Sequence, residues 1–517
     1  MRLYRMIVLE SIVGTKNLGF VIDHNRCIGC HACTVACKEE HEVPVGVFRT
    51  WVKYAEKGAF PDTSRHFGVL RCNHCEAAPC MQICPTRALF RRPDGIVDFD
   101  NSRCIGCKGC MQACPYDALY IDPNSHTAAK CNFCAHRVEA DLNPACVIVC
   151  PTQAIIAGDL ADPASKISRI VAREKVTVRK PQKGTKPKVF YVGIEGDLLR
   201  PTQLAAQSSY MWAERRADSK TREDFDPRLT REVYDVKHPV PWGSKISAYL
   251  WTKSIAAGAL LVPAILLELS RRTGDLFTVI CPLIALFALA VTSLLLIFDL
   301  KRPERFFFLM TKSNFSSWLV LGGYILMGYG GLGTAWLVLG FVTRGVPHPL
   351  TWATAAFAIG SACYSAFLFA QAKGRDLWQS PMFLWHLLVH ALTAGACVVL
   401  LAGVGAGARF AVLRDAALIL FFALLLSLAM VLAEIALPHA TEDAALASHS
   451  MVKGPYRMQF WGLAMGVGFA VPIVLSALFL FCWHSPALAI VSAVLALAGL
   501  FWYEDVWVKA GQVVPLS

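Results

Sequence analysis

Cysteine spacing is the feature of this sequence that points most directly to chemistry. Of the 20 cysteines in 517 residues, 16 lie within the first 150, in four runs of four. The runs are Cys27/Cys30/Cys33/Cys37, Cys72/Cys75/Cys80/Cys84, Cys104/Cys107/Cys110/Cys114 and Cys131/Cys134/Cys146/Cys150. The first and third have the spacing C-x2-C-x2-C-x3-C, which holds cubane iron–sulfur clusters. At four thiolates per cluster, the runs predict four [4Fe–4S] clusters.

Two other uses of cysteine fit this spacing less well. Cysteines so close in sequence are poor disulfide partners. A zinc ribbon uses two Cys-x2-Cys pairs and has no need of a third cysteine followed by Cys-Pro. Three of the four runs end in Cys-Pro, at Pro85, Pro115 and Pro151. We therefore expect a row of one-electron carriers, and the open question is what this row connects.

The composition changes near residue 240. Up to Val240 the chain is polar, with 34 Lys+Arg against 27 Asp+Glu, and beyond it the chain is mostly apolar, with 16 against 11. We expect a soluble domain over 1–200, a polar connector over 201–245 and a membrane domain over 246–517. The basic residues are scattered and many flank apolar stretches, which favours contact with lipid headgroups and gives no indication of nucleic acid binding.

Each cysteine run reads as a loop followed by a short helix, and short strand-like stretches lie between the runs. The predicted strands are Gly95–Phe99, Leu119–Asp122 and Val189–Val192. This pattern resembles a two-cluster bacterial ferredoxin, doubled. The expected fold is therefore an α+β ferredoxin-like iron–sulfur domain followed by an all-α transmembrane helix bundle.

Eight apolar stretches after Ser247 are long enough to span a bilayer. They cover about 247–269, 276–298, 316–341, 351–370, 382–403, 411–435, 459–483 and 486–503. An even number of spans places both ends of the bundle on one side of the membrane. Small residues four apart, as at Gly462/Gly466 and Ser361/Ser365, predict close helix packing.

The basic residues near the span ends predict the orientation. Eleven lie on the side of the cysteine-rich domain and five on the other side, so the cysteine-rich domain and both termini should be cytoplasmic. Residues 6–13 are interrupted by Glu10, and Arg2 and Arg5 are not a twin-arginine pair, so we expect no cleavable export signal. The predicted location is the inner (cytoplasmic) membrane, with several passes.

Motifs in both halves indicate a family. The cysteine runs resemble the four-cluster electron-transfer subunit of DMSO-reductase-type molybdenum enzymes. The membrane half resembles the polysulfide-reductase (NrfD-type) membrane subunit, through Tyr249-Leu-Trp-Thr-Lys-Ser-Ile-Ala-Ala-Gly258, Asp299-Leu-Lys-Arg-Pro-Glu-Arg305 and Gly454-Pro-Tyr. The two subunits are usually separate chains, and here they are fused.

The resemblance implies a ligand set for each cluster, because the fourth cysteine of a ferredoxin run ligates the neighbouring cluster. The implied sets are Cys27/Cys30/Cys33/Cys150, Cys37/Cys131/Cys134/Cys146, Cys72/Cys75/Cys80/Cys114 and Cys84/Cys104/Cys107/Cys110. Lys38 follows Cys37 where the other runs have proline, so we expect a local difference in geometry there.

Ionisable side chains within spans are costly and mark candidate functional sites. Lys253 and Tyr249 share a face of the first span, Asp299 ends the second, and His386 and His390 share a face of the fifth. All five lie in the half of the bilayer nearest the cysteines. They would supply the hydrogen-bond donors and proton carriers that a quinone needs, with Lys253 and His386 as its binding residues.

Plainer roles exist for some of these residues. Asp299 would pair with Arg302 or Arg305 to fix a loop, and His390 would be a satisfied packing residue. His386 and His390 lie on one helix and cannot ligate one haem iron from opposite faces, and the family normally lacks haem, so no haem is expected.

The expected function is electron transfer between a cytoplasmic, molybdopterin-containing catalytic subunit and the membrane quinone pool. The chain has no substrate-pocket motif of its own, so substrate chemistry belongs to the partner chain. Two alternatives remain: a quinone-linked ion-translocating module, and a quinone reductase fed by a soluble ferredoxin. The sequence does not choose the partner's substrate, the quinone type or the direction of electron flow.

Overall fold

The computed structural model describes residues 16–59, 61–204, 230–270 and 274–517. Its contacts divide the chain into two compact units, one formed by Met1–Pro239 with Pro515–Ser517 and the other by Val240–Val514. The stretch 6–13 and residues 205–229 of the predicted connector lie outside the described residues.

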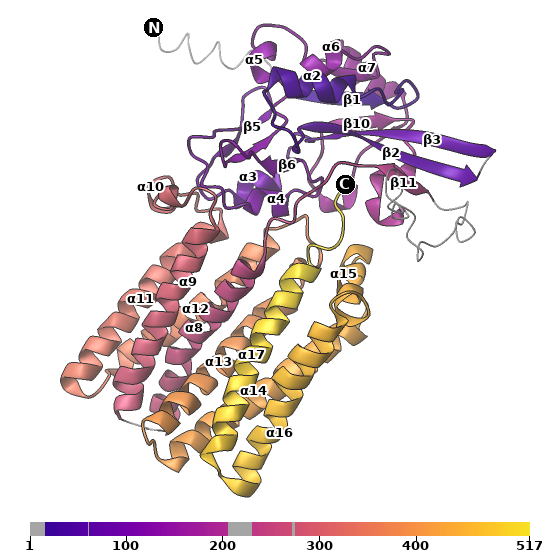
Figure 1. Ribbon diagram of the computed structural model, residues 1–517. Coiled ribbons are helices and arrows are strands. Elements are labelled where there is room, and N and C mark those ends of the chain that lie inside the picture. Colours follow the sequence, from indigo (N-terminus) through magenta and orange to yellow (C-terminus); the bar gives the residue numbers. More distant parts are fainter. Residues whose placement is uncertain (1–15, 60, 205–229, 271–273) are drawn as a thin grey trace, which may run out of the picture. The chain divides into compact units, whose positions relative to one another are not determined.

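Two sheets form the frame of the first unit (Figure 1). The four-stranded sheet has the order β8-β1-β10-β9, with β1 parallel to β10 and antiparallel to β8. The three-stranded sheet has the order β11-β2-β3 and is antiparallel. The bounds are β1 Leu18–Asp23, β2 Thr50–Ala59, β3 Asp62–Arg71, β8 Ile155–Asp159, β9 Val176–Thr177, β10 Val189–Val192 and β11 Arg231–Tyr234. The apolar residues Phe20, Ile22 and Val189 are fully buried between these elements.

Short elements carry the cysteine runs. The two hairpins are β4 (Leu89–Arg91) with β5 (Val97–Phe99), and β6 (Leu119–Ile121) with β7 (Ala128–Lys130). The helices are α2 Ala32–Glu40, α3 Pro79–Ile83, α4 Gly109–Ala113, α5 Ala135–Val138, α6 Ala145–Ile148 and α7 Lys166–Arg173. The strands predicted at Gly95–Phe99, Leu119–Asp122 and Val189–Val192 are therefore present, the last with the predicted bounds.

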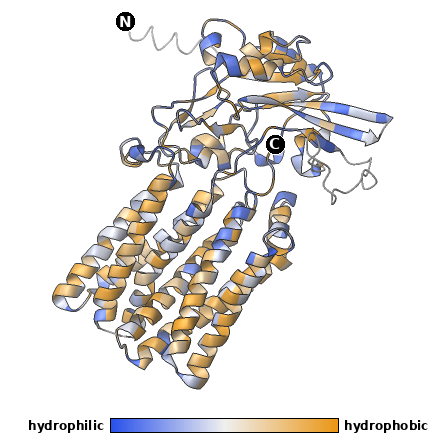
Figure 2. Cartoon of the chain, viewed as in Figure 1, coloured by the Kyte–Doolittle hydropathy of each residue, from blue (hydrophilic) through white to orange (hydrophobic). Residues whose placement is uncertain are grey.

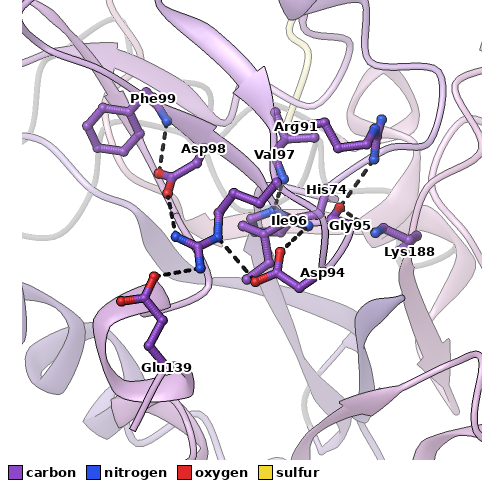
Figure 3. A network of polar contacts seen from close by, with 11 residues as sticks. His74, Arg91, Asp94, Gly95, Ile96, Val97, Asp98, Phe99, Glu139 and Lys188 are labelled. Carbon is purple, nitrogen blue, oxygen red and sulfur yellow. Dashed lines mark hydrogen bonds and ion pairs between the residues drawn. The ribbon is translucent and has the colours of Figure 1, made fainter. Parts of the chain in front are cut away.

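A polar network joins the β4–β5 hairpin to the second cysteine run (Figure 3). The backbone N–H of Val97 donates to Nδ1 of His74, 3.3 Å away, and Arg91 donates to the carbonyl oxygen of Cys75 at 2.7 Å. Lys188 donates to the carbonyl oxygen of Gly95 at 2.6 Å. These bonds fix the loop that carries Cys75 against β5.

The chain end belongs to the first unit. Lys53 of β2 donates to the carbonyl oxygen of Ser517 at 3.0 Å, and Arg179 donates to that of Leu516 at 3.1 Å. Lys53 is fully buried and also forms ion pairs with Glu232 at 2.7 Å and Asp235 at 3.1 Å. Because β11 pairs with β2, the described part of the predicted connector contributes a strand to this unit.

The described residues of the second unit form a bundle with eight helical segments long and apolar enough to span a membrane, as the sequence predicts (Figure 2). They are α8 Ser244–Ser270, Leu276–Asp299 (a π-helical turn, then α9 Cys281–Asp299), α11 Trp318–Thr343, α12 His348–Ala370, α13 Met382–Gly405, α14 Phe410–Ala436, Gln459–Trp483 (π-helical except for α16 Val471–Leu478) and α17 Pro486–Ala510. Two shorter helices, α10 (Phe308–Thr311) and α15 (Glu442–Val452), lie between spans.

Glycine contacts set two helix crossings in this bundle. A Cβ on Gly258 of α8 would collide with the backbone of Ala391 and Gly395 of α13, and a Cβ on Gly395 would collide with Gly258 in turn. Gly468 and Gly499 make the same kind of contact between the seventh span and α17. The backbones meet directly at both crossings, which only glycine permits.

The packing predicted at Gly462 and Gly466 is absent. A Cβ on Gly462 would meet no atom within 4 Å, and one on Gly466 would meet only the carbonyl oxygen of Trp461 from its own helix, at 3.2 Å. At Gly462 and Gly466 the prediction from four-residue spacing was therefore wrong. Ser361 and Ser365 of α12 are fully buried, and Ser365 accepts a hydrogen bond from Lys253 of α8.

Gly395→Val should force α8 and α13 apart and destabilise the bundle by about 1–3 kcal/mol, the usual cost of overpacking a tight interior. Gly462→Val is the matched control, since its new side chain enters open space. Thermal unfolding of the detergent-solubilised protein measures both. Equal midpoints for Gly395→Val and Gly462→Val would contradict the close crossing.

Candidate metal centres and intramembrane polar site

Two cavities in the first unit are each lined by four cysteine side chains. Cys72, Cys75, Cys80 and Cys114 line one, with Pro79 and Tyr116 beside them. Cys84, Cys104, Cys107 and Cys110 line the other. Each set takes three cysteines from one run and one from the other, the interleaving expected of paired clusters.

Charge interactions between neighbouring side chains divide the remaining eight cysteines into two groups. Burial raises the pKa of Cys27, and so do the charges of nearby Cys150 and Cys30. Burial likewise raises the pKa of Cys37, and its charged neighbours are Cys131, Cys146 and Cys134. Two further groups thus form around Cys27 and Cys37, each drawing on the fourth run.

The four groups form one row. Charge interactions between groups join Cys33 to Cys146, Cys131 to Cys72, and Cys110 to Cys80. The row therefore runs from the group of Cys27 through those of Cys37 and Cys72 to that of Cys84. Numbered in this order below, the groups are the first to fourth sites.

A left-handed residue precedes the second cysteine of every run. These residues are Gly29 (φ 69°), His74 (φ 44°), Gly106 (φ 68°) and Phe133 (φ 63°). The turn aims its own N–H back at the first cysteine: Gly106 lies 3.4 Å from Sγ of Cys104, and Phe133 lies 3.5 Å from Sγ of Cys131. Backbone donors of this kind stabilise ligating thiolates.

The three runs that end in Cys-Pro are each followed by a second left-handed turn, and the first run has a different structure. Left-handed residues stand three positions after the last cysteine at Arg87, Asp117 and Gln153. In the first run, α2 instead continues through Cys37 to Glu40. Lys38, which replaces the proline, donates to the carbonyl oxygens of Pro44 at 2.9 Å and Val47 at 2.7 Å. The local difference expected at Lys38 is therefore present.

The donor chemistry of the cysteine groups fits an iron–sulfur cluster. Across the described ranges, which include all 20 cysteines, no disulfide is formed. Four cysteines line each of the two cavities, and backbone N–H groups point at the sulfur atoms of Cys104 and Cys131. Thiol donors of this number and arrangement suit a cubane cluster.

In the second unit, the basic side chain of Lys253 is fully buried. Its Nζ donates to the carbonyl oxygen of Ala362 at 2.7 Å and to Oγ of Ser365 at 2.8 Å. The same nitrogen lies 5.0 Å from the centre of the Tyr364 ring. Tyr249, one turn earlier on α8, donates to the hydroxyl of Tyr364 at 2.6 Å. Tyr249 and Lys253 thus belong to one buried polar cluster, as their spacing predicts.

A second part of this polar cluster centres on the two histidines. Nδ1 of His390 lies 3.2 Å from Oε1 of Glu504, with both side chains almost fully buried. Nε2 of His386 lies 3.2 Å from Oε2 of Glu434, and the Glu434 side chain is 25% exposed. The ring of Tyr503 packs 5.9 Å from that of His386 and 5.5 Å from that of His390. The two parts lie on helices in direct contact, because Gly258 of α8 packs against the backbone of Ala391 of α13, the residue after His390.

Three buried polar atoms in the second part have no hydrogen-bond partner among the described residues. They are Nδ1 of His386, Nε2 of His390 and Oε2 of Glu504. Buried polar atoms are almost always satisfied by protein, water or ligand. This cluster, comprising Tyr249, Lys253, His386, His390, Glu434 and Glu504, can therefore accept a polar ligand or a proton.

Asp299 stands apart from Lys253. It ends α9, where the neighbouring residue Phe298 accepts a hydrogen bond from Lys245 of α8 at 3.2 Å. Lys253 lies eight residues further along α8, roughly 12 Å of helical rise away. Asp299 is therefore placed at the end of the bundle, and not beside the buried polar cluster.

Sequence reasoning missed Glu504, the acid closest to His390. The apolar stretch seemed to end at residue 503, whereas α17 continues to Ala510 with Glu504 and Asp505 both buried. The signal was available in Val506, Trp507 and Val508, which continue the apolar pattern beyond the two acids.

Comparison with known proteins covers both units. A family model described as a 4Fe-4S dicluster domain matches residues 64–160, and one described as polysulphide reductase, NrfD, matches residues 232–515. The second match includes every span and the whole buried polar cluster.

Relatives of the first unit are iron–sulfur subunits of reductases. The sequence is 44% identical to the B subunit of tetrathionate reductase from Salmonella typhimurium over 198 residues, 38% of this chain and 79% of the relative. It is 43% identical to the B subunit of polysulfide reductase from Wolinella succinogenes over 182 residues, 34% of this chain and 94% of the relative. It is 34% identical to the arsenate respiratory reductase iron-sulfur subunit ArrB of a Shewanella species over 223 residues, 34% of this chain and 95% of the relative.

Because the NrfD model spans more than half of the sequence, and the first unit covers most of the length of reductase iron–sulfur subunits, this protein belongs to the NrfD polysulphide reductase family and carries an iron–sulfur electron-transfer domain fused ahead of its multi-pass membrane domain.

Proposed function

We propose that this protein passes electrons between a molybdopterin-type catalytic subunit and the membrane quinone pool through four [4Fe–4S] clusters. The single observation that carries the proposal is the row of four cysteine groups in the same chain as an NrfD membrane domain. Bound clusters would supply one-electron redox chemistry at each group. The cysteines would hold them in the interleaved sets, with Cys27 and Cys84 in opposite end sets.

The polypeptide shapes each site for cluster ligation. Left-handed turns stand at Gly29, His74, Gly106 and Phe133, and those at Gly106 and Phe133 direct backbone N–H groups toward sulfur. The short helices α3 and α4 end just before Cys84 and Cys114, so that these cysteines reach across to the neighbouring set. Solvent is excluded from the second and third sites, because all eight of their cysteines are buried.

The buried polar cluster would bind the quinone. Lys253 donates to Ala362 and Ser365 and keeps a further N–H for a quinone carbonyl oxygen, and Tyr249 would turn its O–H from Tyr364 toward the bound quinone. The pairs His390–Glu504 and His386–Glu434 can hold and move protons. Glu434, the most exposed of these groups, stands where protons from water would enter. Asp299, at the end of α9, would act near the same boundary.

The names of the relatives support the proposal that a catalytic partner chain exists. The matching proteins of tetrathionate reductase and polysulfide reductase are each, by name, one part of a larger reductase. We infer that a separate catalytic chain docks with the iron–sulfur unit and carries the substrate chemistry. The charge distribution at the span ends favours a cytoplasmic position for that unit, with an inner-membrane location.

Iron analysis tests the cofactor content. The purified, fully loaded chain should contain about sixteen iron atoms and as many acid-labile sulfides, four for each predicted cubane. Cys107→Ser should disturb the fourth site and leave the other three assembled, as electron paramagnetic resonance can show. Fewer than about twelve iron atoms, or stoichiometric zinc, would contradict the assignment.

Lys253→Met should slow electron exchange with a quinol analogue by about 100-fold or more, the usual effect of removing a hydrogen-bond donor to an oxygen that gains negative charge. Lys245→Met is the matched control, because Lys245 is exposed on the same helix, two turns earlier. Its rate should stay within about twofold of the parent, and both variants should keep their iron. A normal rate for Lys253→Met, His386→Gln and His390→Gln alike would place the quinone site elsewhere in the bundle.

Reporter fusions test the orientation. A phosphatase that is active only in the periplasm should be inactive when fused after Ser517 and active when fused at Arg344, since the basic residues number eleven against five across the membrane. The opposite pattern of activity would reverse the orientation and the side on which the catalytic partner docks.

A further inference from the structure

Arg71 is a fully buried cation with an unusual set of neighbours. It ends β3, and its side chain has no exposed surface. Lys53, which is equally buried, has Glu232 and Asp235 within ion-pair distance. In the described part of the chain, no carboxylate lies within ion-pair distance of Arg71, so its charge must be balanced in another way.

The neighbours of Arg71 are sulfur atoms and one aromatic ring. Its Nη1 donates to Sγ of Cys146 at 3.1 Å, and its guanidinium carbon lies 4.6 Å from the centre of the Phe20 ring. The atoms Nε and Nη2 are buried without a hydrogen-bond partner among the described residues. Cys33 lies in the same buried cluster as Cys146 and the Phe20 ring, so the charge of Arg71 acts on Cys33 as well as on Cys131.

These contacts place one cation between two cluster sites. Cys146 and Cys131 belong to the second site, and Cys33 belongs to the first. A buried charge without a partner costs several kcal/mol, so a cation at this position requires negative charge nearby. A cubane held by four thiolates carries net negative charge, and that charge increases by one when the cluster takes up an electron.

We propose that Arg71 raises the reduction potentials of both the first and the second cluster, the two at one end of the electron row, because its positive charge stabilises their reduced states. The inference rests on the proposed ligand sets. Each centre gains one electron, no bond to Arg71 forms or breaks, and no proton moves. Net charge and hydrogen bonds to sulfur are two of the factors that set cluster potentials, and Arg71 supplies both to the second site.

The effect should differ between the two clusters. The charge of Arg71 reaches both sites, whereas its N–H bond reaches only Cys146 of the second. Losing the charge should therefore lower both midpoint potentials, and losing only the directed N–H bond should lower that of the second. The fourth site, two positions further along the row, serves as an internal reference.

The test is a redox titration of the purified full-length chain, followed by electron paramagnetic resonance. Cys30→Ser and Cys107→Ser assign the signals of the first and fourth sites. Arg71→Gln removes the charge and keeps an amide donor, while Arg71→Lys keeps a cation and changes the donor geometry. Arg179→Gln is the matched control, because Arg179 is an equally buried guanidinium that donates to the carbonyl oxygens of Tyr116 at 3.4 Å and Leu516 at 3.1 Å.

In Arg71→Gln, the equilibrium constant for reduction should fall at least tenfold at the first and second sites, about 59 mV for a one-electron centre, with the fourth site unchanged. Arg71→Lys should hold the first midpoint near the parent value and lower the second by less than Arg71→Gln does. Arg179→Gln should leave both at parent values.

Parent midpoints in an iron-loaded Arg71→Gln protein would overturn the inference. If Arg71→Gln fails to retain iron, Arg71→Lys decides: an unchanged first midpoint supports the role of charge, and a tenfold fall in its reduction equilibrium constant overturns it. The unmodified chain reports on the proposed function separately, because its iron content and four signals do not depend on any Arg71 variant.

Discussion

The first unit depends on the free-energy cost of ionising sixteen buried cysteines close to one another, and on the groups that offset this cost. Sixteen cysteines lie in four groups, and burial and neighbouring sulfur charges raise the pKa of members such as Cys37 and Cys75. The helices between them have only four or five residues in α3, α4, α5 and α6, too short to be stable alone. Metal ligation would offset the cost of ionisation and fix these turns together, so the fold and the cofactors should form as one. Arg71 and the backbone N–H groups aimed at sulfur act in the same direction.

The second unit faces the opposite problem, since lipid offers no water to buried polar groups. The buried polar side chains of this unit are paired with one another or with the backbone. Lys253 pairs with Ser365 and the carbonyl oxygen of Ala362, His390 with Glu504, and His386 with Glu434. The acids at the other end of the bundle, Glu268 and Asp275, are likewise paired, with His348 and Arg344. What distinguishes the buried polar cluster is that His386, His390 and Glu504 each keep one buried atom without a described partner.

Features that depend on local sequence patterns could be predicted from the sequence, whereas features that depend on long-range contacts could not. Cysteine spacing predicts the four groups, and apolar length predicts the eight spans, because both are local signals. The long hairpin of β2 and β3 was not predicted from the sequence. The third strand of its sheet, β11, comes about 160 residues later. Arg71 looked like an ordinary strand residue, and Glu504 fell just past an apparent span end. Only packing places the first beside Cys146 and the second beside His390.

The central claim is that the clusters and the quinone belong to one electron path within this chain. The most direct test reconstitutes the chain in liposomes whose only quinone is a long-chain species confined to the bilayer. The clusters are first reduced chemically, the excess reductant is removed, and their reoxidation is followed by absorbance. The account predicts reoxidation that needs the lipid quinone and is lost in Lys253→Met. Clusters that stay reduced with quinone present, or that reoxidise equally fast in Lys253→Met, would contradict it.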